Sequence, residues 1–84
     1  MSDPGTGKGE SEISRLVAEL EQEIAGLEQE QRRCEARARE LMEREARGEG
    51  VFADQIFRQK QEKLRLATEI RHRQVRINHL RLGV

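Results

Sequence analysis

Aromatic residues are almost missing from this sequence of 84 residues, which has no Trp, no Tyr and only two Phe. Clefts that bind substrates or cofactors are lined mainly by apolar and aromatic side chains around a sizeable core. A chain of this length forms at most one small domain. We therefore expect no enzyme activity, no cofactor and no small-molecule substrate.

Cysteine, proline and long apolar runs are also scarce. The single cysteine excludes an internal disulfide, and with it a disulfide-stapled secreted scaffold. No run approaches the ~18 apolar residues of a membrane-spanning helix, and the first residues do not resemble a signal peptide. We therefore expect a cytoplasmic protein that does not contact membranes.

The chain is instead rich in charge and in helix-forming residues. Charged side chains make up 38% of the sequence, and 16 basic residues balance 16 acidic ones, so the net charge is zero. Ala, Glu, Leu, Arg and Gln are abundant, a composition typical of long helices. The composition therefore predicts an all-α fold.

Residues 1–10 differ from the rest of the chain. They contain its only proline and three of its seven glycines, which favours a flexible N-terminal tail. The pair Gly7-Lys8 lacks the flanking residues and the preceding strand of a phosphate-binding loop. We therefore expect no nucleotide site in this tail.

Residues 11–47 carry apolar residues at steps that alternate between three and four. This spacing is the heptad repeat of a coiled-coil seam, and it predicts one long helix. The predicted seam of this helix contains Ile13, Val17, Leu20, Ile24, Leu27, Cys34 and Leu41.

Two glycines, Gly48 and Gly50, then predict a turn over residues 48–50, because glycine readily takes the left-handed conformation that ends a helix. The same alternating steps return in residues 51–82 and predict a second helix. Its seam contains Ile56, Leu66, Ile70, Ile77 and Leu80, with the polar Gln59, Lys63 and Arg73 between them.

So short a turn predicts an antiparallel two-helix hairpin. In the best register, paired residue numbers add to 97, so that Leu20 faces Ile77. Residues 10–30, with seven Glu and one Arg, then lie beside residues 68–84, with four Arg and one Glu. A continuous parallel rod is the alternative, because a coiled coil can absorb the glycine segment as a stutter.

A second group of apolar residues lies on the flank of the second helix, roughly 100–150° around from the seam at 100° per residue. These residues are Phe57, Leu64, Val75 and Leu82. We expect a second copy to cover this flank, giving a homodimer that forms a four-helix bundle, or the helices of another protein to do so.

Two groups of residues suggest chemistry only weakly. Lys63 lies opposite Cys34 in the predicted register and would lower the thiol pKa, but a buried structural cysteine is the simpler interpretation. His72 and His79 are two turns apart, roughly 10.5 Å, which is too far to share a metal ion. We therefore expect no catalytic residue and no metal site.

Arginine is far more frequent than lysine, and Arg65 and Arg76 lie with the histidines on the outer side of the second helix. Such a row of cations can bind phosphates, which suggests a nucleic-acid-binding regulator as the alternative function. The zero net charge and the lack of stacking aromatics disfavour it. The sequence favours a noncatalytic coiled-coil interaction module: an adaptor, a scaffold component or a small chaperone-like subunit.

Overall fold

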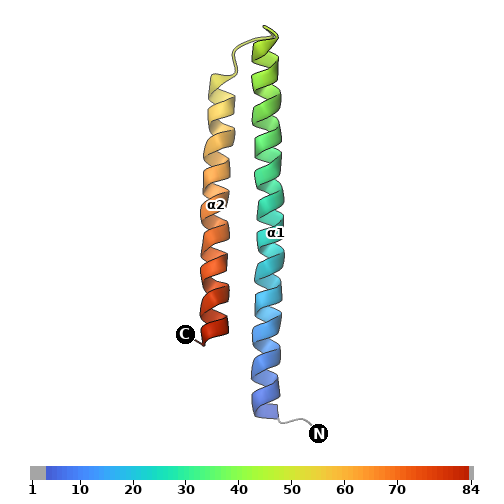
Figure 1. Cartoon of the computed structure of the whole chain (residues 1–84), viewed down its shortest axis with the longest axis vertical. Helices are drawn as coiled ribbons and strands as arrows, with labels where there is room; N and C mark the ends of the chain where they lie inside the picture. The colour runs from blue at the N-terminus through green and yellow to red at the C-terminus, as the bar shows by residue number, and fades with distance from the viewer. Residues whose placement is uncertain (1–3, 84) are drawn as a thin grey trace.

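The computed structural model describes the backbone of residues 4–83 and the side chains of residues 12–83. Helix α1 (Pro4–Ala46) and helix α2 (Ala53–Leu82) are antiparallel and lie side by side (Figure 1). The molecule measures 69 × 22 × 11 Å, whereas a rod of about 70 helical residues would span about 105 Å. The predicted all-α antiparallel hairpin is confirmed.

The helix bounds differ from the expected ones. Helix α1 begins at Pro4, seven residues before the expected start, and proline suits the first position of a helix because it has no N–H to leave unsatisfied. Of the tail expected over residues 1–10, residues 1–3 lie outside the described part. Helix α2 begins at Ala53 because the turn extends to Phe52.

The chain reverses direction where α1 ends in a left-handed turn. Gly48 has φ +76° and Gly50 has φ +150°. The Gly48 N–H donates to the Glu45 carbonyl at 2.9 Å, and the Glu49 N–H donates to the Arg44 carbonyl at 3.0 Å. These bonds satisfy carbonyls that the end of the helix would otherwise leave open.

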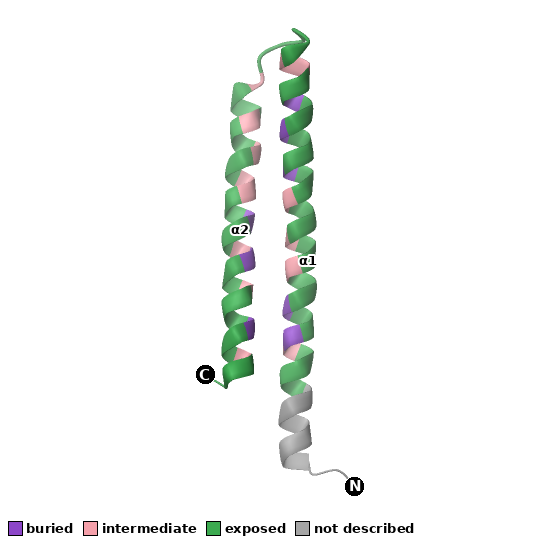
Figure 2. Ribbon diagram, in the orientation of Figure 1, coloured by how far each residue is buried: buried purple, intermediate pink, exposed green. Residues whose placement is uncertain are grey.

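The buried residues in the described part of the chain lie on the sides of the two helices that face each other, as the purple bands of the ribbon in Figure 2 show. Leu41 and Leu66 are fully buried. The buried set consists of Val17, Leu20, Cys34, Ala38, Leu41, Leu66, Ile70 and Ile77. Around them, Ile24, Leu27, Ile56 and Leu80 are half-buried.

One residue assigned to the seam is exposed in the structure. Ile13 is 39% exposed. Helix α2 ends at Leu82, so the turn of α1 that carries Ile13 extends beyond the last turn of the partner helix. The heptad pattern of α1 therefore extends beyond the part of α1 that packs against α2.

Two cations in the seam of α2 are held by acids of α1. Arg73 donates from Nε to Glu23 at 2.9 Å, and Lys63 Nζ lies 2.5 Å from a Glu35 oxygen. In each pair, the acid of α1 lies next in the sequence to the residue that the expected register places opposite the cation. The long side chains reach out of the seam with their charged ends, so no charge is buried without a partner.

We predict that Leu66→Ala will destabilise the hairpin by about 2–5 kcal/mol, because a fully buried leucine leaves both lost contacts and a cavity. The matched control is Leu64→Ala, two residues away on the same helix but 63% exposed, which should change stability by less than about 0.5 kcal/mol. Thermal and urea unfolding followed by circular dichroism measure both. Equal losses would contradict the observed seam.

We predict that Gly48→Ala/Gly50→Ala will shift the protein toward the extended rod. Alanine gains about 1 kcal/mol per position over glycine in a helix and is disfavoured in the left-handed turn. A Cβ on Gly50 would also lie 3.2 Å from the Phe52 ring. Small-angle scattering should give a maximum dimension near the rod length.

Gly26→Ala provides the control for this pair of substitutions. Gly26 lies inside α1, and a Cβ there meets no atom within 4 Å. This variant should keep the maximum dimension of the hairpin and should melt at a higher temperature. A double turn variant with unchanged dimensions would show that the glycines do not determine the reversal.

Candidate functional site: the outer face of helix α2

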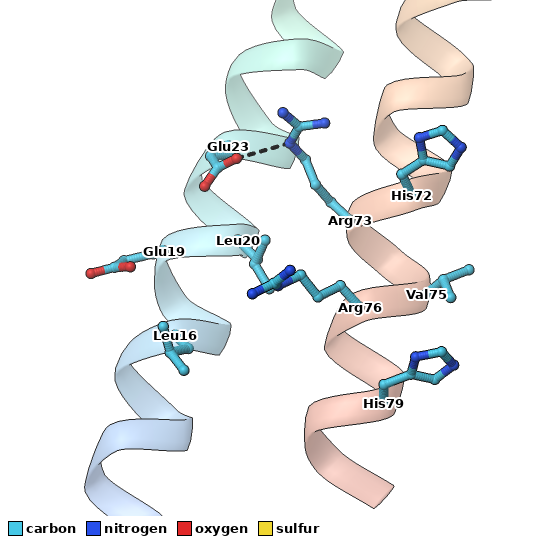
Figure 3. A pocket seen from close by; sticks show the side chains of 9 residues that line it. All are labelled: Leu16, Glu19, Leu20, Glu23, His72, Arg73, Val75, Arg76 and His79. Carbon is cyan, nitrogen blue, oxygen red and sulfur yellow. Dashed lines mark hydrogen bonds and ion pairs between the residues drawn. The ribbon is translucent and has the colours of Figure 1, made fainter. Parts of the chain in front are cut away.

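Helix α2 leaves four large apolar side chains in solvent. Phe57 is 61% exposed, Leu64 63%, Val75 43% and Leu82 75%. We call these four residues the outer stripe. They lie almost opposite the seam, and Figure 3 shows Val75 pointing away from α1. The fold of the isolated hairpin therefore does not use them.

Basic side chains surround the outer stripe. Arg58, Lys60 and Arg71 are exposed, and they form no ion pair with any residue in the described part of the chain. The two glutamates of α2, Glu62 and Glu69, lie instead at its edge toward α1. The outer face of α2 is therefore both apolar and cationic.

The acids at that edge are already paired. An Arg65 Nη2 lies 2.5 Å from Glu62, and an Arg73 Nη1 lies 2.7 Å from Glu69. These hydrogen bonds lower the pKa of both glutamates below the usual value. Both carboxylates thus stay ionised and occupied, and they do not neutralise the unpaired cations of the outer face.

Arg76, the second arginine singled out from the sequence, borders a groove between the helices of about 590 Å³. The groove has Leu16 and Leu20 on one side and Val75 on the other. Figure 3 shows Arg76 reaching toward Leu20. Arg65 and Arg76 therefore lie in different surroundings, the first in an ion pair and the second over an apolar floor.

His72 and His79 border the same groove and point away from α1 (Figure 3). Among residues 12–83, no group of three or more His, Cys, Asp or Glu side chains is placed to hold a metal ion. In the described helices, none is long and apolar enough to cross a membrane.

The environment of Cys34 differs from a reactive thiol site. The side chain is buried, and this burial, together with the negative charges of Glu62 and Glu30, raises the thiol pKa above its usual value. Lys63, which would have lowered the pKa, pairs with Glu35 instead. The activated-thiol interpretation is therefore wrong, and Cys34 packs as a small core residue.

The tip of the hairpin holds its acid in place. Glu49 accepts hydrogen bonds from Arg47 at 2.6 Å and Arg44 at 3.3 Å, which lower its pKa below the usual value. Arg44 also lies over the Phe52 ring, 4.6 Å from its centre. The Phe52 N–H donates to Glu45. Glu49 and Glu45 are therefore both engaged in closing the tip of the hairpin.

Sequence reasoning identified the outer stripe but missed the basic residues beside it. The heptad pattern of the seam gives no role to Arg58, Lys60 and Arg71, because they lie outside its core positions. A heptad pattern through the outer stripe has Arg71 at a core position and Arg58 and Lys60 beside core positions. This second pattern in the sequence is the signal that identifies them.

Comparison of the chain with protein-family models, with curated protein sequences and with solved structures finds no match.

We predict that Cys34 in the folded protein will react slowly with an aromatic disulfide reagent at pH 8, because few thiols there are ionised or accessible. The control is Cys34→Ser/Ala36→Cys, which moves the thiol to an exposed position on the same helix. The control should react at least about tenfold faster. Similar rates would contradict the buried, raised-pKa environment of Cys34.

Proposed function

We propose that this protein is a noncatalytic interaction module of the cytoplasm, an adaptor or scaffold subunit that binds other proteins through the outer stripe of α2. The observation that carries this proposal is the exposure of Phe57, Leu64, Val75 and Leu82 on one helix whose opposite side is already packed. Exposed apolar residues gathered on one face are typical of protein interaction sites.

Burial of this face by a partner would contribute favourably to the free energy of binding. Complete burial of one such side chain contributes about 1.5–3 kcal/mol relative to exposure. Four of them spread along α2 therefore offer more than the cost of ordering a few side chains. A partner that covers only one or two of these residues would bind weakly.

The seam supports the proposal because it makes the hairpin self-sufficient. Leu41 and Leu66 are fully buried between α1 and α2 without any contribution from the outer stripe. A binding face that does not contribute to the fold of its own chain can be covered and uncovered without unfolding. This is the behaviour that an adaptor requires.

The alternative is a nucleic-acid-binding regulator that uses Arg65 and Arg76. The pairing of Arg65 with Glu62 makes this alternative the weaker one, because a carboxylate beside the guanidinium repels phosphate. The described outer face also has Phe57 as its one aromatic side chain, and base stacking needs several. The experiment below separates the two functions.

We predict that a photoreactive amino acid at position 57 or 64 will form discrete protein adducts in the cells that produce this protein. The expected adducts are a second copy of the chain or another protein, since a docked surface holds the probe within reach of its partner. Position 22 is the control, because Gln22 is exposed on the side of α1 that faces away from α2. Mass spectrometry identifies the adducts.

Three outcomes would contradict the proposed function. Absence of discrete adducts from positions 57 and 64, or an equal adduct pattern from position 22, would show that the stripe is ordinary surface. Adducts to RNA or DNA would instead favour the nucleic-acid alternative. Helical content measured by circular dichroism checks that each probe variant is folded.

A further inference from the structure

The four residues of the outer stripe fall at core positions of a second heptad pattern, and the other four core positions between them are polar. When the polar residues between its members are added, the steps along α2 alternate four and three from Phe57 to Leu82 without a break. This outer register consists of Phe57, Gln61, Leu64, Thr68, Arg71, Val75, Asn78 and Leu82, all of them exposed. Such spacing fits the side chains of another helix, because the knobs of a partner that supercoils around α2 meet it turn after turn.

The positions on both sides of this outer register are basic or neutral. One flank contains Arg58, Arg65, His72 and His79, and the other contains Lys60, Ala67, Gln74 and Arg81. None of the eight is acidic. In a coiled coil, these flanking positions determine which charge the partner helix must carry.

A second copy of α2 is a poor occupant in the antiparallel orientation. The apolar residues would match, with Phe57 opposite Leu82 of the second copy and Leu64 opposite its Val75. However, Lys60 would then lie beside Arg81 of the second copy, whose ion pair with Glu21 is long, at 3.9 Å, and exposed to solvent. Like charges placed together at flanking positions repel each other and therefore disfavour this pairing relative to pairing with an oppositely charged helix.

The parallel orientation of two α2 helices meets the same obstacle. Each residue of the outer register would then face its own copy, which places Arg71 against Arg71. The charge pattern of α2 therefore opposes self-pairing in either direction, whereas acids on a partner would satisfy both flanks.

We propose that the occupant of this face is an acidic amphipathic α-helix of another protein, with apolar residues at heptad spacing and Glu or Asp on both sides of them. This inference rests on the proposed function and specifies its partner. An acid of the partner lies against Arg71, the one cation inside the outer register. The partner extends along α2 from Phe57 to Leu82.

The probes for this proposal are two synthetic four-heptad helical peptides with Leu at the core positions. One carries Glu at all flanking positions, and the other carries Lys. Isothermal titration of the full-length protein should show binding of the Glu peptide and binding at least about tenfold weaker for the Lys peptide. The affinity for the Glu peptide should fall between about 50 mM and 500 mM salt.

Two variants test which surface binds the peptide. Phe57→Ser/Leu64→Ser should reduce the affinity for the Glu peptide at least about tenfold, as should Lys60→Glu/Arg71→Glu, while helical content is kept. Arg33→Glu is the matched control, because Arg33 is an exposed cation of α1. It should bind the Glu peptide as the unmodified protein does.

Equal binding of the Glu and Lys peptides, or absence of binding, would overturn the proposal. Undiminished binding of the Glu peptide to the Phe57→Ser/Leu64→Ser variant would also overturn it, because the peptide would then bind elsewhere, for example by inserting between α1 and α2. A homodimer in light scattering that the same variant abolishes would identify a second copy as the occupant and also overturn the proposal. If any of these results occurs but the photoreactive residue at position 57 still forms discrete protein adducts, the proposed function stands and only the acidic partner helix is ruled out.

Discussion

A single interface between two helices supplies the buried residues in the described part of this chain, and the other features depend on it. Leu41 and Leu66 are fully enclosed there, but Arg73 lies in the same row of α2. The guanidinium is accommodated because Glu23 of α1 and Glu69 of α2 both accept hydrogen bonds from it. A shift by one heptad would separate Arg73 from Glu23, so the polar position fixes the register while the leucines provide the stability.

The seam also determines what remains outside. Two acids of α1, Glu23 and Glu35, are occupied by the seam cations Arg73 and Lys63, so they do not pair with Arg58, Lys60 or Arg71 on the far side of α2. A molecule with zero net charge therefore has one helix face that is apolar and positive. The asymmetry arises from the positions of the acids, and neither composition nor net charge reveals it.

Periodicity was sufficient to predict two helices, the reversal at Gly48 and most of the buried residues, because these depend on where apolar side chains and glycines fall along the chain. It did not predict that Ile13 would be exposed, since that depends on where the other helix ends. It favoured a buried structural Cys34, which the structure confirms, and only the weaker alternative, a thiol activated by Lys63, had the wrong direction for the pKa. The direction of that pKa shift depends on the ion pair between Lys63 and Glu35. The partner of a long flexible side chain depends on which groups lie near it in the folded structure, and the heptad pattern does not specify this.

The turn that joins the helices has one more consequence, which concerns concentration. Because α1 and α2 are parts of one chain, their pairing is an intramolecular equilibrium that dilution does not weaken. Arg44 over Phe52 and the bond from Phe52 to Glu45 keep the linked ends together. The hairpin is therefore assembled at any abundance of the protein, and only occupancy of its outer face by the proposed partner would respond to how much of each a cell contains.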